Sequence, residues 1–239
     1  MRTLLWLCTG LVLCAPAPQQ RAATEPALDP LERLKLGNQR YQSGQAAHFN
    51  QERDRRLDLA RAQHPFALVV GCADSRVPPE IVFDQGLGDL FVVRCAGEAL
   101  DDLALASIEY AVLHLDVRTI VVLGHERCGA VQATLERGEL PGHLKYLARA
   151  IAPHIEDARR RIPAGAVEIA PDLLDLAVVQ NVRAVVAELE ACEPILSDLS
   201  HTGELRVVGA RYDLDSGAVE WLPAQAAEPA RAQRNSARR

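Results

Sequence analysis

The chain has 239 residues, of which 49% are hydrophobic and 24% are charged. This composition allows one sizeable core and argues against a disordered protein. The formal net charge of −6 leaves no general basic surface, which argues against nucleic acid as the main partner.

The first 23 residues resemble a secretory signal peptide. One arginine precedes an apolar run from Thr3 to Cys14, which is followed by small residues and prolines. The run is too short to cross a bilayer as a permanent anchor, which is the alternative. A lipoprotein with an acylated Cys14 is a weaker alternative because the bulky Leu13 precedes that cysteine. We therefore expect a signal peptide over 1–23, an exported and periplasmic protein, and no membrane span after cleavage.

Removal of this segment would leave four cysteines in the mature chain. Four thiols in a chain of this length are too few for a disulfide scaffold, and isolated thiols favour a metal site. The four are Cys72, Cys95, Cys128 and Cys192.

Two helices are predicted before the core. The segment from Asp29 to Gly44 has a capping aspartate, a proline at the first helical position and leucines at helical spacing. A second, polar helix is expected around residues 51–62.

Three short apolar runs follow, rich in β-branched residues, as expected of parallel strands buried on both faces. They span 66–72, 89–95 and 118–125. The segment 204–222 then contains two strands around an Asp-Ser-Gly turn, which predicts a hairpin.

Helical patterns lie between these strands. They cover 101–115, 142–160, where Pro153 should bend or break the helix, and 171–190. Alternating strands and helices predict an α/β fold with a mostly parallel central sheet flanked by helices and the hairpin at its edge. We expect one domain over 29–222 and a disordered tail over 224–239, which lacks apolar periodicity.

Thiols and an imidazole occur at the ends of two predicted strands. Cys72 ends the first strand, whereas His125 and Cys128 close the third. The carboxyl ends of parallel strands meet at one edge of a sheet, so the three side chains should converge. Each alone is weak evidence, since a cysteine at a strand end is usually a core residue. Together they suit a catalytic zinc with one exchangeable position.

A carboxylate and a guanidinium follow the first thiol. Asp74 and Arg76 can form an ordinary turn with a weak surface ion pair. They can also have a sharper role: Asp74 can bind the metal itself unless Arg76 holds it in a bidentate pair.

The motif CADSR at 72–76, followed by HERC at 125–128, resembles the zinc motifs of the β-class carbonic anhydrases, and the likeness extends from Leu31 to Leu222. The resemblance implies one Zn²⁺ per subunit, reversible hydration of carbon dioxide to bicarbonate and a proton by a zinc-bound hydroxide, and a homodimer or dimer of dimers embraced by the N-terminal helices. The implied metal ligands are Cys72, His125 and Cys128, with Asp74 when it closes on the metal. The implied gating pair is Asp74 and Arg76, and Gln63, Ser75 and Gly129 are the implied substrate-pocket residues.

The chain departs from the family pattern after the second strand. It has Cys95-Ala96-Gly97-Glu98 where Ala-Gly-Asn is expected, so we expect an added charge near the crevice and a core thiol at Cys95. No other histidine matches a ligand position, which leaves the proton shuttle unassigned. These histidines are at 48, 64, 114, 143, 154 and 201.

Other functions stay open at this point. The same fold can act as a hydrolase of carbonyl sulfide or carbon disulfide, or keep zinc as a non-catalytic assembly protein. A thiol oxidoreductase is disfavoured because no Cys-x-x-Cys occurs, and a nucleotide site has only the weak motif Gly86-Leu87-Gly88.

Overall fold

The computed structural model describes residues 28–136, 140–162 and 169–224. The expected signal peptide at 1–23 and nearly all of the expected tail at 224–239 lie outside these residues. Among the described helices, none has the length and apolar character needed to cross a membrane.

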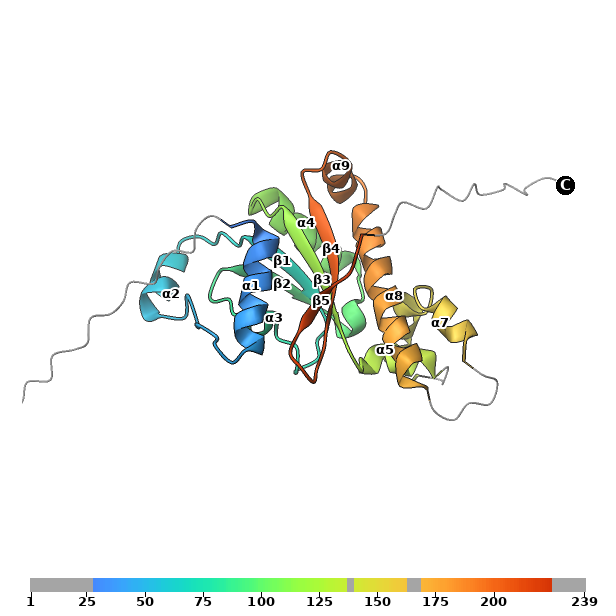
Figure 1. Ribbon diagram of the computed structural model, residues 1–239. Coiled ribbons are helices and arrows are strands. Elements are labelled where there is room, and N and C mark those ends of the chain that lie inside the picture. Colours follow the sequence, from blue (N-terminus) through green and yellow to red (C-terminus); the bar gives the residue numbers. More distant parts are fainter. Residues whose placement is uncertain (1–27, 137–139, 163–168, 225–239) are drawn as a thin grey trace, which may run out of the picture.

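A five-stranded sheet with the order β2-β1-β3-β4-β5 forms the centre of the molecule (Figure 1). The first four strands in this order run parallel, and β5 pairs antiparallel with β4, which confirms the mostly parallel sheet and the edge hairpin. The strands are β1 (Ala67–Gly71), β2 (Leu90–Arg94), β3 (Thr119–His125), β4 (Arg206–Tyr212) and β5 (Val219–Trp221).

The prediction that the second strand is buried on both faces is wrong. All five residues of β2 are half-buried, whereas every residue of β1 and β3 is buried. The reason is position: β2 lies at one edge of the sheet and pairs with a single strand, β1, among the described residues. Its apolar run predicts a strand but carries no information on the strand order.

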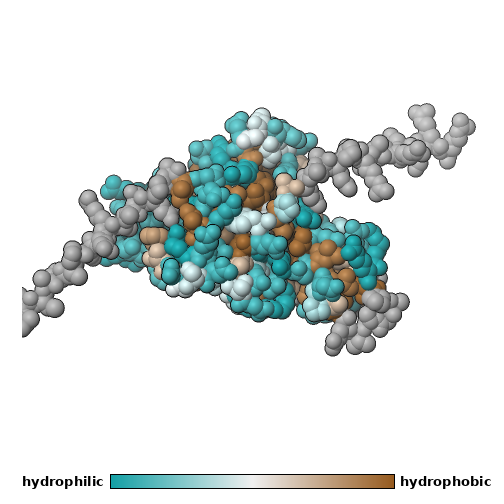
Figure 2. All heavy atoms as spheres, in the orientation of Figure 1, coloured by the Kyte–Doolittle hydropathy of each residue, from teal (hydrophilic) through white to brown (hydrophobic). Residues whose placement is uncertain are grey.

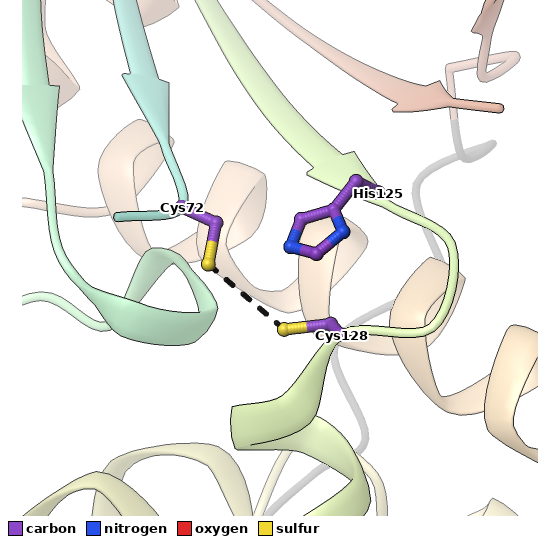
Figure 3. Close-up of side chains that lie close together, drawn as sticks. All are labelled: Cys72, His125 and Cys128. Carbon is purple, nitrogen blue, oxygen red and sulfur yellow. Dashed lines mark hydrogen bonds between the residues drawn. The ribbon is translucent and has the colours of Figure 1, made fainter. Parts of the chain in front are cut away.

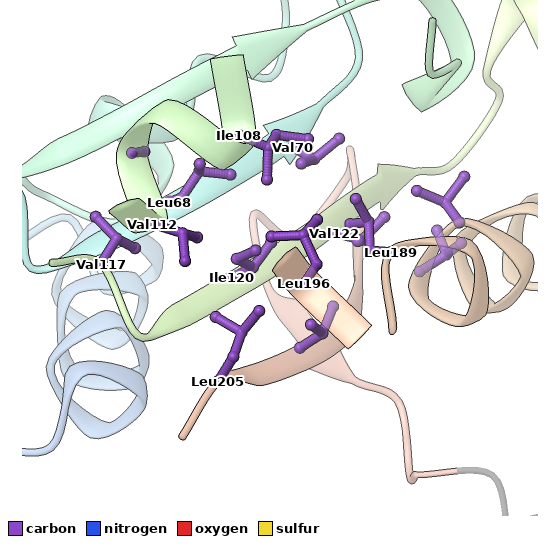
Figure 4. Packing of buried hydrophobic residues seen from close by; sticks show 14 residues of the cluster. Leu68, Val70, Ile108, Val112, Val117, Ile120, Val122, Leu189, Leu196 and Leu205 are labelled. Carbon is purple, nitrogen blue, oxygen red and sulfur yellow. The ribbon is translucent and has the colours of Figure 1, made fainter. Parts of the chain in front are cut away.

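One face of the sheet is covered by α4 (Asp102–His114), α8 (Pro171–Glu190) and α9 (Ile195–His201) (Figure 4). Side chains of these helices pack against Leu68 and Val70 of β1 and against their neighbours on β3. The short helix α9 was not predicted from the sequence.

The other face is covered by α1 (Pro30–Gln42) and α3 (Pro79–Val82). Asp29 caps α1 by accepting from the backbone amides of Leu31 and Glu32, as its position before a proline predicts. Leu34 of α1 is fully buried against this chain's own sheet. By contrast, α2 (Arg53–Leu59) buries no residue, so contact of these helices with a partner subunit stays a prediction.

A third cluster of buried residues lies where the strands end. It joins α5 (Gly129–Leu135), α6 (Leu144–Ile151) and α7 (Glu156–Arg160) to the first half of α8, and it includes Cys72 and Cys128. The expected helix at 142–160 is broken between α6 and α7, next to Pro153, as its proline predicts.

The surface combines charged regions with scattered apolar ones. On the face shown in Figure 2, hydrophobic patches lie between hydrophilic regions. Several large apolar side chains are exposed, a pattern that often marks contact surfaces when the residues are contiguous. They include Leu36, Leu57, Ile81, Leu87, Leu103, Tyr110, Leu113, Leu144 and Tyr146.

Candidate metal centre

Three ligand atoms meet at the carboxyl edge of the sheet (Figure 3). Cys72 directly follows β1, His125 is the last residue of β3, and Cys128 is the residue before α5. Their ligand atoms all lie within 4.8 Å of one another, and all three residues are buried. The parallel pairing of β1 with β3 brings together Cys72 and His125, which are 53 positions apart in the chain, as the sequence predicts.

The geometry of this group fits zinc. The two Sγ atoms are 4.0 Å apart, far too long for a disulfide, but suited to two thiolates on one tetrahedral ion with Zn–S bonds of about 2.3 Å. His125 Nδ1 lies 2.8 Å from the carbonyl oxygen of Glu126, which fixes the Nδ1–H tautomer. His125 Nε2 is buried and makes no hydrogen bond within the described part of the chain, as expected of an atom that binds a metal.

The two thiols differ in their acidity. The hydrogen bond from Cys128, helped by His125 and by the Gly97 amide, lowers the pKa of Cys72 far below that of an ordinary thiol. The same contact, together with burial, raises the pKa of Cys128. Cys72 is therefore the thiol that loses its proton first.

A tight turn donates a backbone hydrogen bond to the sulfur of Cys72. The short 3₁₀ segment η1 (Ala96–Glu98) directs the amide of Gly97 at Cys72 Sγ, with an N–S distance of 3.2 Å. Gly97 has φ 66°, and a Cβ there would lie 2.6 Å from Ile151 Cδ1, so only glycine fits.

Arg76 holds Asp74 beside the cluster. Arg76 Nε donates to Asp74 Oδ1 at 2.9 Å and Nη2 donates to Oδ2 at 2.7 Å, a bidentate pair as the sequence predicts. The guanidinium lowers the pKa of the Asp74 carboxyl, which stays ionised. Asp74 Oδ2 lies 3.8 Å from His125 Nε2, so the carboxylate is within easy reach of the ligand cluster.

Arg94 fixes the loop that carries this pair, a contact that sequence reasoning missed. Its Nε donates to the carbonyl oxygen of Cys72 at 2.8 Å, and its Nη2 donates to that of Asp74. The available signal was its position at the end of a predicted strand, as for Cys72, whereas the pairing of the two strands is known only from the structure.

Glu98, expected to add a charge near the crevice, is buried instead of exposed there. Its side chain is 1% exposed, and burial, with the nearby Cys72, raises the pKa of its carboxyl well above the usual range. Cys95, expected in the core, is half-buried.

The three expected substrate-pocket residues lie in different places. Gly129 begins α5 next to Cys128, and Ser75 lies exposed between Asp74 and Arg76. Gln63 is exposed in a surface pocket with Tyr110 and His114, before the amino end of β1, whereas Cys72 follows the carboxyl end of that strand. Within one chain, Gln63 is therefore not brought to the cluster.

Several known proteins are similar to this chain in sequence. A family model described as carbonic anhydrase matches residues 67–219. A carbonic anhydrase of Mycolicibacterium smegmatis is 44% identical over 191 residues, which cover 78% of this chain and 89% of the relative. Carbonic anhydrase 2 of Mycobacterium tuberculosis is 44% identical over 188 residues, covering 77% of this chain and 87% of the relative.

Solved structures share the fold. One of two tetrameric β-carbonic anhydrases from Sordaria macrospora has a TM-score of 0.62 at 28% identity, over 77% of this chain and 90% of that chain. A Coccomyxa β-carbonic anhydrase in complex with acetazolamide also has a TM-score of 0.62, at 29% identity, over 83% of this chain and 87% of that chain. The chain belongs to the β class of the carbonic anhydrases, which interconvert carbon dioxide and bicarbonate.

Proposed function

We propose that carbon dioxide hydration takes place at a zinc ion held by Cys72, His125 and Cys128. The observation that carries this proposal is the buried group of three ligand atoms within 4.8 Å, whose His125 Nε2 makes no hydrogen bond to any described residue. A zinc ion bound there supplies Lewis acidity and lowers the pKa of a water molecule toward about 7.

Asp74 and Arg76 have two tasks in this proposal. The ionised Asp74 accepts a hydrogen bond at Oδ2 and so orients the attacking oxygen toward the carbon of carbon dioxide. Arg76 occupies both carboxylate oxygens and keeps Asp74 from binding the metal itself. Release of Asp74 from Arg76 would let the carboxylate take the open position and stop turnover.

Ser75 and Gly129 are proposed to border the substrate. Both adjoin a residue of the cluster, and the space above Gly129 is open, since a Cβ there would meet no atom within 4 Å. Gln63 is proposed to act in the same pocket only when a second subunit brings it there, because in its own chain it lies beyond the opposite end of β1.

The test combines metal content with catalysis. The purified chain from residue 24 should contain one zinc ion per subunit and hydrate carbon dioxide in stopped-flow assays. Chelation should remove both, and zinc alone should restore both. A metal-free protein with full activity would overturn the proposal.

The alternative functions are not supported. The relatives reported above are all named carbonic anhydrases, not hydrolases of carbonyl sulfide or carbon disulfide. A non-catalytic zinc protein has no need of the Asp74–Arg76 pair, because a purely structural site requires no open position.

The same proposal includes assembly and export. A homodimer or dimer of dimers is supported by the exposed Leu36 and Tyr110, by the half-buried edge strand β2, and by the tetrameric relative from Sordaria macrospora. Light scattering of the purified protein tests this assembly. Export to the periplasm rests on the pattern of residues 1–23 alone, and fractionation of cells that express the full chain tests it.

A further inference from the structure

Asn181 of α8 is a completely buried polar residue, 0% exposed, in a helix face that otherwise packs apolar side chains. A buried amide costs stability unless its donors and acceptor are all satisfied. Asn181 meets this condition through contacts with two other parts of the chain, η1 and the segment between α6 and α7. These contacts link α8 to both segments.

Two of the contacts hold the turn beneath Cys72. Asn181 Nδ2 donates to the carbonyl oxygen of Gly97 at 2.8 Å and to Glu98 Oε2 at 3.2 Å. The amide of Gly97, in the same turn, donates to Cys72 Sγ at 3.2 Å. The Asn181 side chain is therefore hydrogen-bonded to Gly97, and Gly97 is hydrogen-bonded to the proposed metal ligand Cys72.

The Gly97–Glu98 turn requires stabilising contacts because its backbone is strained. Gly97 and Glu98 both have left-handed φ angles, 66° and 51°. Glutamate pays a steric cost in this region, so the conformation persists only where neighbouring groups enforce it. Asn181 contacts both residues and is the group placed to enforce it.

The third contact sets the orientation of Asn181. Since Nδ2 faces two acceptors, Oδ1 is the acceptor for His154 Nδ1, at 3.0 Å. His154 Nε2 lies 3.9 Å from Glu188 on the outer side of α8. A chain of contacts thus runs from a half-buried histidine through Asn181 to the turn under Cys72.

We propose that Asn181 is a positioning residue of the metal centre: by clamping the Gly97–Glu98 turn, it keeps the Gly97 amide hydrogen-bonded to the Cys72 thiolate. This inference rests on the proposed zinc site. Partners of metal ligands commonly change metal affinity by about 10- to 100-fold when they are removed. The amide also draws electron density from the sulfur, so its loss makes the thiolate a stronger electron donor.

The decisive variant is Asn181→Asp, which keeps the volume and the acceptor for His154 but replaces the amide that donates twice to the turn by a carboxyl group. In the cobalt-substituted protein we expect the sulfur-to-cobalt charge-transfer band to move to longer wavelength. We also expect zinc to leave about 10-fold faster or more when a chromogenic chelator competes for it.

Val185→Ala is the matched control. Val185 is buried one turn further along the same face of α8. It belongs to the apolar cluster that α4, α8 and α9 form with β1 and β3, away from η1. Its variant should lower the melting temperature while leaving the cobalt spectrum and zinc release unchanged. A control variant that moves the spectrum equally would show a general effect of loosening α8 and would overturn the inference.

The outcomes separate the two claims. An unmodified protein that takes up neither zinc nor cobalt overturns the proposed function and this inference together. If it takes up both metals and Asn181→Asp has an unchanged spectrum and release rate, only the inference fails. Should Asn181→Asp not fold, Asn181→Ser removes the same donors and is judged by the same two readouts.

Discussion

Arg76 donates to both carboxylate oxygens of Asp74, from Nε at 2.9 Å and from Nη2 at 2.7 Å, while Asp74 Oδ2 lies 3.8 Å from His125 Nε2. The carboxylate is thus close enough to bind a metal ion held by this cluster, and Arg76, two residues along the chain, holds it back. Substitutions of Asp74 and of Arg76 should therefore have different effects on the metal site.

Asp74→Asn should keep zinc and lose most activity. The amide retains the shape of the side chain but is a poorer acceptor and carries no charge for Arg76 to hold. We expect zinc content to stay near that of the unmodified protein while hydration falls by about 10²-fold. Stopped-flow assays with metal analysis measure both, and full hydration activity would contradict the proposed role.

Arg76→Ala should keep the carboxylate of Asp74 but release it from its partner. The released carboxylate already lies near Cys72, His125 and Cys128. A crystal structure of the zinc-loaded variant is expected to show Asp74 as an additional metal ligand, with activity lost. A carboxylate still turned away from the metal would refute the gating account. Arg118→Ala is the control, since Arg118 pairs with the exposed Asp116 on the loop before β3.

Cys72→Ser should abolish zinc binding and activity together, because serine offers no thiolate to the metal. Cys192→Ser is the matched control: Cys192 is a free, half-buried cysteine between α8 and α9. The control should bind zinc as the unmodified protein does. Zinc retained by the Cys72 variant would exclude Cys72 as a ligand.

Asp84 makes part of the stability depend on pH. Burial opposes its ionisation, but the amides of Ala47 and His48 and the guanidinium of Arg40 outweigh burial and lower the pKa of its carboxyl. Its stabilising contribution is therefore complete above the unfolded-state pKa of about 3.9 and is lost as the pH falls through the lower folded-state value.

The corresponding variant is Asp84→Asn. Its unfolding free energy, from urea titrations between pH 5 and pH 3, should fall less steeply with decreasing pH than that of the unmodified protein. Equal slopes would show that Asp84 does not contribute to acid sensitivity. Asp54→Asn is a control, since Asp54 is exposed at the start of α2.

The central elements and the metal cluster were predictable because their signals are local. β1, β3 and α8 have unbroken patterns, and Cys72 and His125 lie at strand ends that a parallel sheet must bring together. Short elements such as α3 and η1 escaped prediction because four or three residues carry too little periodicity.

Side-chain contacts between distant segments that no motif marks were not predictable. The burial of Glu98 depends on Asn181, 83 residues later, and on a left-handed turn that its residue type does not suggest. Gln63 shows why spacing along the sequence does not give proximity in space. It lies nine residues before Cys72, but the extended strand β1 runs between them and places Gln63 at the opposite end of the sheet.

The separation of the three apolar clusters has a consequence for the metal-free protein. The apolar clusters on the two faces of the sheet contain neither cysteine ligand, although His125 ends β3, whereas the cluster of α5, α6 and α7 includes Cys72 and Cys128. Two of the three ligands therefore belong to the cap formed by α5, α6 and α7, and a metal ion bound to them would join this cap to His125 at the end of β3. After chelation, amide hydrogen exchange should accelerate first in the cap, while the central strands remain protected.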